Sequence, residues 1–268
     1  MNFCGESGLC VSQAGESIAF EQPLTERVRT FLRLEFLFGQ HEHHRRDHSE
    51  FGVRATLHTM LDTLVVLSRS DLKNDILKEL TDQHTHLTRL AARPNIDRDR
   101  LGDILGEITR AQNGLQQLAT QFAGSLLRES DFLNGILNRS GIPGGTCGFD
   151  LPHYHFWLSQ PYERVRRDLD AWRADIKPFT DAIGLYLRLL RASVEPQPAE
   201  GRGGMYIVTP PGPCQLIRVL VAQQSGVYPE ISAGKHRCTV RFMNARDAAA
   251  RAQQATTDVG FQIQFCAL

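Results

Sequence analysis

A cysteine, an aspartate and two histidines lie close together in sequence and are residue types that covalent catalysis uses. A cysteine thiolate attacks a substrate when a histidine accepts its proton and a third group orients that histidine. Cys147 would be the nucleophile, His153 or His155 the base, and Asp150 the orienting group. Closeness in sequence does not establish this geometry, so a cysteine-dependent hydrolase stands as the alternative to a purely structural thiol.

A histidine-rich stretch between residues 41 and 48 is the second candidate for chemistry. Imidazole is a common ligand of transition metals, and His44 and His48 are spaced i, i+4, so one interpretation is a zinc site that also uses His41 and His43. No apolar residues accompany the cluster to hold such ligands rigidly. We therefore interpret the stretch as a mobile polar connector between two helices, and we expect neither a metal nor another cofactor.

Basic residues recur along a predicted strand that runs from Lys235 to Phe242. Because successive side chains of a strand point to opposite faces, Lys235, Arg237 and Arg241 should share one face. The inward face would carry His236, Cys238, Val240 and Phe242. Like charges on one face repel one another, which favours an anionic partner for this surface.

The composition limits the kinds of partner. The chain of 268 residues carries 30 basic and 30 acidic side chains, and this balance argues against general affinity for nucleic acid. A binder of single strands would also place aromatic residues among its basic ones, whereas Thr239 is the residue that lies between them here. No window holds the roughly 20 apolar residues of a membrane span, and the first residues lack the pattern of a secretory signal. We expect a cytoplasmic protein without a nucleic-acid or membrane partner.

Six cysteines are spread along the chain, at positions 4, 10, 147, 214, 238 and 266. They form no CxxC pair and show no zinc-like spacing. In a reducing compartment they are most simply free thiols, several of them acting as small buried hydrophobic residues.

Helical periodicity runs through most of the chain, with apolar residues at steps of three and four. Ser, Asp and Pro stand at several expected helix starts. Seven helices are predicted: one from about Phe20 with Leu24, Val28, Phe31, Leu34 and Phe38 inward, then Glu50–Arg69, Ser70–Pro94, Asp97–Phe122, Ser130–Gly141, Ser159–Ile176 and Pro178–Val194. We expect an elongated bundle of helical hairpins whose remaining apolar surface suits a dimer.

The segment from Gly141 to Leu158, here called the joint, interrupts the helices. Its glycines and prolines exclude a continuous helix. It also carries too many apolar and aromatic residues for a free loop, so we predict an ordered, packed crossing that brings His153 and His155 near other elements.

The apolar period changes to two after a segment rich in Pro and Gly at residues 195–204. Strands are predicted at 205–209, 215–222, 235–242 and 259–265. The sequence therefore predicts an α+β fold, with an N-terminal helical domain of about seven helices and a smaller antiparallel β domain. The expected boundaries are a disordered extension at 1–17, the helical domain at 18–194, a linker at 195–204 and the β domain at 205–268.

Three blocks of sequence together resemble the ZapD family of bacterial division proteins, and they occur in the family's order. The blocks are FEQPLTERVRTFLRLEF, GIPGGTCGFDLPHYHFWL and YPEISAGKHRCTVRFM, with DLKNDILKEL between the first two. The resemblance implies a helical and a β domain, a symmetric homodimer, and binding of the C-terminal tail of the tubulin-like GTPase FtsZ. It also implies crosslinking of FtsZ protofilaments into bundles that support the Z-ring and septum formation.

The resemblance also implies which side chains bind the tail, around a cleft between the two domains. The positions that match the family's basic residues are Arg33, Arg69, Arg237 and Arg241, and His155 matches a histidine of the joint. Asp131 stands where the family pattern has a basic residue, and neighbouring Arg128 could substitute for it. Lys235 is added from the alternation of the basic strand.

Such a protein would be an adaptor rather than an enzyme, placed at mid-cell through FtsZ. A short, partly acidic and otherwise disordered tail loses conformational entropy on binding, so a modest affinity is expected. Two tail sites on one dimer would hold two filaments, and many weak links would add up through avidity.

Overall fold

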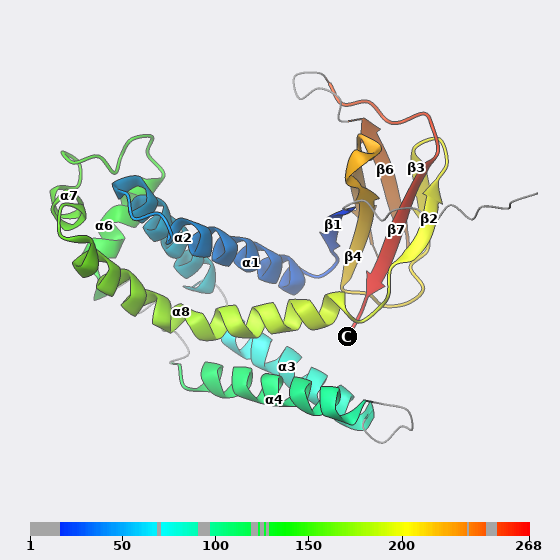
Figure 1. Cartoon of the computed structure of the whole chain (residues 1–268), viewed down its shortest axis with the longest axis horizontal. Helices are drawn as coiled ribbons and strands as arrows, with labels where there is room; N and C mark the ends of the chain where they lie inside the picture. The colour runs from blue at the N-terminus through cyan, green and yellow to red at the C-terminus, as the bar shows by residue number, and fades with distance from the viewer. Residues whose placement is uncertain are drawn as a thin grey trace, which may run out of the picture. The chain divides into compact units, whose positions relative to one another are not determined.

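The chain divides into two units, one built of helices and one built of strands (Figure 1). A computed structural model describes residues 17–268 apart from 69–70, 91–96, 119–122, 124–125, 127–128, 235 and 245–250. The helical unit comprises Glu26–Arg191, and the β unit combines residues 17–25 with Ala192–Leu268, as far as these residues are described. The predicted α+β class, with helices mostly before strands, is therefore confirmed.

Seven α-helices lie within the described part of the chain, the number predicted, although the set differs. They are α1 (Glu26–His44), α2 (Glu50–Ser68), α3 (Leu72–Leu90), α4 (Arg98–Gln116), α6 (Asp131–Ser140), α7 (Pro152–Leu158) and α8 (Tyr162–Arg191). The short helix α7 falls inside the joint, where no helix was predicted. The two helices expected around Pro178 form one helix, α8. Proline removes one backbone hydrogen bond, which bends a helix without always ending it, and α8 curves in Figure 1.

The core of the helical unit follows the predicted apolar stripes. Val28, Phe31, Leu34 and Phe38 of α1 are buried, as predicted, and α1 packs against α2 and α8. α4 packs against α3 and α8. Two of the predicted N-caps are also confirmed, since the side chain of Asp97 accepts from the amide of Arg100 and that of Ser130 from the amide of Leu133. The N-cap predicted at Ser159 is wrong, because Ser159 ends α7.

The β unit contains two antiparallel sheets. The four-stranded sheet has the order β1 (Ser17–Pro23), β4 (Leu216–Ala222), β7 (Val259–Cys266) and β2 (Gln197–Gly201). The three-stranded sheet has the order β3 (Met205–Val208), β6 (Cys238–Asn244) and β5 (Val227–Ala233), and a short 3-10 helix η1 (Gln223–Ser225) precedes β5. Their shared core contains Val219, Val240, Phe242 and Phe261.

Three of the strands were not predicted, and all three lie at sheet edges: β1, β2 and β5. Most of β1 was interpreted as the start of the first helix, but β1 pairs with β4. Its first residue, Ser17, was assigned to the disordered extension, and the other residues of that extension lie outside the described part of the chain. β2 falls in the expected linker and pairs with β7. Each of the three contains a proline, Pro23, Pro198 or Pro229. Proline is tolerated at a sheet edge, because an edge strand does not need the backbone donor that proline lacks. Pro23 was therefore wrongly interpreted as part of a first helical turn, and Pro198 as part of a linker.

The basic strand begins later than predicted, at Cys238. Gly234 donates to the carbonyl of Arg237 at 2.9 Å, so Arg237 lies in the turn between β5 and β6 and strand alternation does not orient it. Cys238, Val240 and Phe242 are buried, as predicted. His236 is exposed, and its predicted inward orientation is wrong for the same reason.

Candidate functional site

The joint is ordered and partly packed. Tyr154 and Trp157 of α7 are buried, and the indole of Trp157 donates to Asp168 at 2.8 Å. Phe149 and Phe156 are instead 85% and 59% exposed, although both were counted among the packed residues of the joint. The joint therefore has a buried side and a side that presents aromatic rings to solvent.

The cysteine, aspartate and histidines of the joint are not arranged as a catalytic group. The Sγ of Cys147 donates to Oδ2 of Asp150 at 3.4 Å, and Arg139 lies 3.7 Å from the same carboxylate. The ring of His153 packs edge-on against Phe132. Among the hydrogen bonds of the described residues, none joins Cys147 to a histidine or Asp150 to a histidine. Asp150 thus holds a thiol and a guanidinium rather than orienting a base.

Arg54 of α2 fixes the joint, a role that no local sequence pattern indicated. Its Nη1 donates to the carbonyl of Thr146 at 3.0 Å, and its guanidinium lies 4.9 Å from the ring centre of Tyr154. Burial raises the pKa of Tyr154 to about 12. The contact joins residues far apart in sequence, which local patterns do not reveal.

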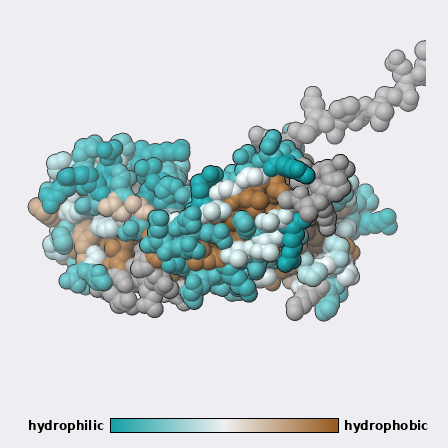
Figure 2. Space-filling view, turned by 90° about the horizontal axis from the view of Figure 1, so that it is seen from below, coloured by the Kyte–Doolittle hydropathy of each residue, from teal (hydrophilic) through white to brown (hydrophobic). Residues whose placement is uncertain are grey.

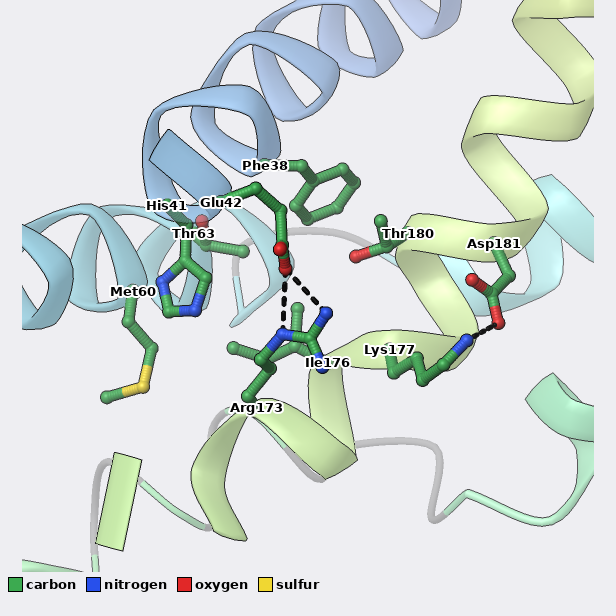
Figure 3. A pocket seen from close by; sticks show the side chains of 10 residues that line it. All are labelled: Phe38, His41, Glu42, Met60, Thr63, Arg173, Ile176, Lys177, Thr180 and Asp181. Carbon is green, nitrogen blue, oxygen red and sulfur yellow. Dashed lines mark hydrogen bonds and ion pairs between the residues drawn. The ribbon is translucent and has the colours of Figure 1, made fainter. Parts of the chain in front are cut away.

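The first half of the histidine-rich stretch belongs to a helix, and its second half connects α1 to α2, as predicted. α1 continues to His44, and His41 is buried where α1, α2 and α8 meet (Figure 3). Beside it, Arg173 donates from Nε and Nη2 to Oε1 of Glu42 at 2.8 and 2.5 Å. The described residues include no group of three or more His, Cys, Asp or Glu side chains placed to hold a metal ion. The ion pair between Glu42 and Arg173 and the buried imidazole of His41 occupy the place where α1, α2 and α8 meet. We interpret them as a structural contact between these helices.

His41 should make the stability of the helical unit depend on pH. Burial lowers its pKa below the ordinary value, despite a hydrogen bond to the backbone of Thr56 and the nearby Glu42; Arg173 and Arg45 lower the pKa further. The unfolded chain then binds a proton that the folded chain does not, so stability is lost as pH falls from about 6.5 toward the lowered pKa. We therefore expect the free energy of unfolding, measured with urea across this pH range, to fall less with decreasing pH in His41→Gln than in wild type. Equal dependence of the free energy of unfolding on pH in the two proteins would contradict this role for His41.

The predicted tail-binding residues lie in both units. Arg33 of α1 and His155 of α7 belong to the helical unit, and Arg237 and Arg241 belong to the β unit. No hydrogen bond or ion pair of the described residues joins one of these four to another. Arg69, Arg128 and Lys235 lie outside the described residues. The predicted cleft between the domains stays a prediction.

Arg33 and His155 both face solvent. Arg33 is exposed on α1, one turn before Phe36, which is itself 65% exposed. A cation and an aromatic ring thus stand together on this helix face. His155 packs against Gly148, where an added Cβ would lie 3.3 Å from Cγ of the imidazole.

Arg241 is the best-defined cation among the candidates. It lies in the middle of β6, opposite Met205 on β3 and Glu230 on β5, and its side chain is 53% exposed. Its Nη2 donates to Oε2 of Glu230 at 2.9 Å. An exposed pair of this kind contributes little to stability and leaves the other guanidinium edges available to an incoming carboxylate. Arg237, in the turn before β6, is also exposed.

Comparison with known proteins places these residues in a family. A family model described as ZapD, cell division protein, matches residues 32–241, which include every candidate tail-binding residue. The chain belongs to the ZapD family of cell division proteins. This membership gives it a role in cell division and confirms the resemblance found in the sequence.

Relatives named cell division protein ZapD match the chain over nearly its full length. The protein from Azoarcus sp. (strain BH72) is 40% identical over 252 residues, which cover 94% of this chain and 100% of the relative. ZapD from Chromobacterium violaceum is 39% identical over 255 residues, covering 93% of this chain and 99% of the relative. ZapD from Coxiella burnetii is 34% identical over 256 residues, covering 93% and 98%.

The described helices are unsuited to crossing a bilayer, because none is both long enough and apolar enough.

Proposed function

We propose that this chain binds the C-terminal tail of FtsZ and, as a homodimer, crosslinks FtsZ protofilaments into bundles that promote Z-ring assembly and septum formation. Membership of the ZapD family over residues 32–241 is the observation that carries the proposal. The chain would act by binding, without catalysis or a cofactor, and would reach the division site in the cytoplasm through FtsZ.

The tail would bind through cations from both units. Arg237 and Arg241 are exposed on the β unit, and guanidinium groups suit carboxylates because they bond in a bidentate way. The further contacts that we propose are Arg33, Arg69, Arg128, His155 and Lys235.

The exposed aromatic side of the joint would serve self-association. Phe149 follows Gly148 and Phe156 follows His155, and these two neighbours contact each other, so the two exposed rings stand on nearby backbone positions. Neither ring offers a charge to an acidic tail. Figure 2 shows hydrophobic residues in patches among larger hydrophilic areas on the face that it draws. Exposed apolar patches commonly mark protein interfaces, and a dimer joined through the helical unit would present two tail sites.

Salt provides the test of the electrostatic part. Binding of a fluorescent FtsZ tail peptide should weaken markedly as ionic strength rises from low to physiological, because exposed charge pairs are screened over about 10 Å at 0.1 M salt. Fluorescence anisotropy measures the affinity, and light scattering followed in the same salt series measures bundling of FtsZ filaments. Affinity and bundling that do not change with salt would argue against a cationic tail site.

A further inference from the structure

The three-stranded sheet has one side chain layer directed toward the other sheet and one directed away from it. Val240 and Phe242 of β6 are buried in the shared core, and Tyr206 of β3 contacts Phe261 of β7. The residues that alternate with these core residues along each strand of the three-stranded sheet therefore face away from the core. We call this layer the outer face, formed by Met205, Ile207, Tyr228, Glu230, Ser232, Thr239, Arg241 and Met243.

The outer face combines one guanidinium with apolar side chains. Met205 lies directly across from Arg241, and Tyr228 pairs with Met243 in the next row. Ile207, on the edge strand β3, is 50% exposed. The β-branched side chain of Ile207 suits a strand. Half of its apolar surface nevertheless stays in water beside a cation, and a partner could cover such a mixed surface.

The register fixes how far Ile207 lies from Arg241. Ile207 pairs with Thr239, and Arg241 follows Thr239 by two residues, so Ile207 and Arg241 are diagonal neighbours. Diagonal neighbours on one sheet face are about 7–8 Å apart. Side chains two positions apart in an extended peptide are separated by nearly the same distance, about 6.5–7 Å.

We propose that the outer face supplies the apolar part of the FtsZ tail site. Ile207, with Met205 beside it, takes an apolar side chain of an extended tail while an acidic side chain two positions away in the tail pairs with Arg241. The inference rests on the proposed function, which supplies the acidic partner, and it adds the residues that set register and specificity. Charge attraction alone would accept any acidic segment, whereas the apolar contact selects segments with the matching spacing.

Glu230 limits which ligands Arg241 accepts. It already pairs with Arg241, and its side chain is 44% exposed, so a tail carboxylate has to share the guanidinium or displace Glu230. An acidic side chain of a ligand therefore adds little affinity by itself, because it has to compete with Glu230. The apolar contact with Ile207 then decides which acidic segments bind well.

The test uses the full-length chain with two variants at one position. Ile207→Ser removes the apolar surface, and Ile207→Thr keeps the β-branch that the edge strand favours while removing part of that surface. Ile18→Ser is the matched control, because Ile18 is 45% exposed on edge strand β1 of the other sheet. Thermal unfolding is measured for each protein, so that loss of folding is separated from loss of binding.

Each protein is titrated with two peptides by anisotropy. One is the FtsZ tail, and the other is the same tail with its apolar residues replaced by serine and its charges kept. Ile207→Ser should weaken binding of the natural tail on the order of tenfold, Ile207→Thr less, and Ile18→Ser hardly at all. With the serine-substituted tail, wild type and Ile207→Ser should bind equally, because the contact that they differ in is already absent.

The outcomes separate the inference from the proposed function. If the wild type binds the natural tail and Ile207→Ser binds it equally well, the apolar contact is overturned while tail binding stands. An equal loss for Ile18→Ser also overturns it, since the effect would then not be specific to the outer face. If the wild type does not bind the tail at all, both proposals fail.

Discussion

The Arg237→Glu, Arg241→Glu double variant should lose binding of the FtsZ tail by on the order of a hundredfold. Both substitutions turn attraction into repulsion at exposed positions of the β unit, and the carboxylate introduced at position 241 would also stand beside that of Glu230. Anisotropy with the labelled tail peptide measures the loss, and sedimentation of FtsZ filaments should show bundling lost with it.

A charge-matched control is available in the same unit. Arg202 and Arg251 are exposed, so Arg202→Glu, Arg251→Glu changes the net charge equally at positions outside the candidate set. This control should bind the tail almost as well as wild type. If both double variants lose the same affinity, the net charge of the unit matters rather than Arg237 and Arg241. If neither loses affinity, the cationic site itself is wrong.

Phe149→Ser, Phe156→Ser should convert the proposed dimer into a monomer that binds the tail but does not bundle filaments. Covering two exposed aromatic rings removes a large apolar area from water, so their loss removes much of what would hold two chains together. Light scattering coupled to size-exclusion chromatography gives the mass, and anisotropy gives the tail affinity. Tail binding per chain should stay at the wild-type level, because bundling needs two sites whereas binding needs one.

Phe36→Ser serves as the control for oligomeric state, because Phe36 is a similarly exposed phenylalanine on α1 rather than in the joint. It should elute with the wild-type mass. A joint variant that remains a dimer would exclude this surface as the interface, and a monomer that still bundles filaments would exclude crosslinking through a dimer.

The helices could be predicted from the sequence where one apolar stripe recurred between clear caps. The stripe of Val28, Phe31 and Leu34 and the cap at Asp97 are examples, because both signals act over a few residues. Pro178 misled the prediction, since α8 tolerates it through packing that local sequence does not express. The burial of His41 was missed for a similar reason, because the residues that cover it come from other helices.

The strands show the same limit at longer range. β4 and β7 were found from their alternation, whereas β1 and β2 are ordered by partners far along the chain and carry proline besides. For the candidate site, the sequence suggested the basic residues, which stay a prediction. The turn that holds Arg237 and the pair between Arg241 and Glu230 could not be predicted, because both depend on the exact hairpin register. Ile207 drew no attention, because an apolar residue in a short, wholly apolar strand is ordinarily interpreted as core.

The chain begins the β unit, leaves it for the whole helical unit, and returns to complete it. β1 ends at Pro23, yet its partner β4 starts at Leu216, so all of Glu26–Arg191 is synthesised between two strands that lie side by side. During translation the helical unit can fold as soon as its own residues emerge, while the first strand waits without a neighbour. The four-stranded sheet can close only after β7 (Val259–Cys266) has left the ribosome, so the β unit is completed after the helical unit.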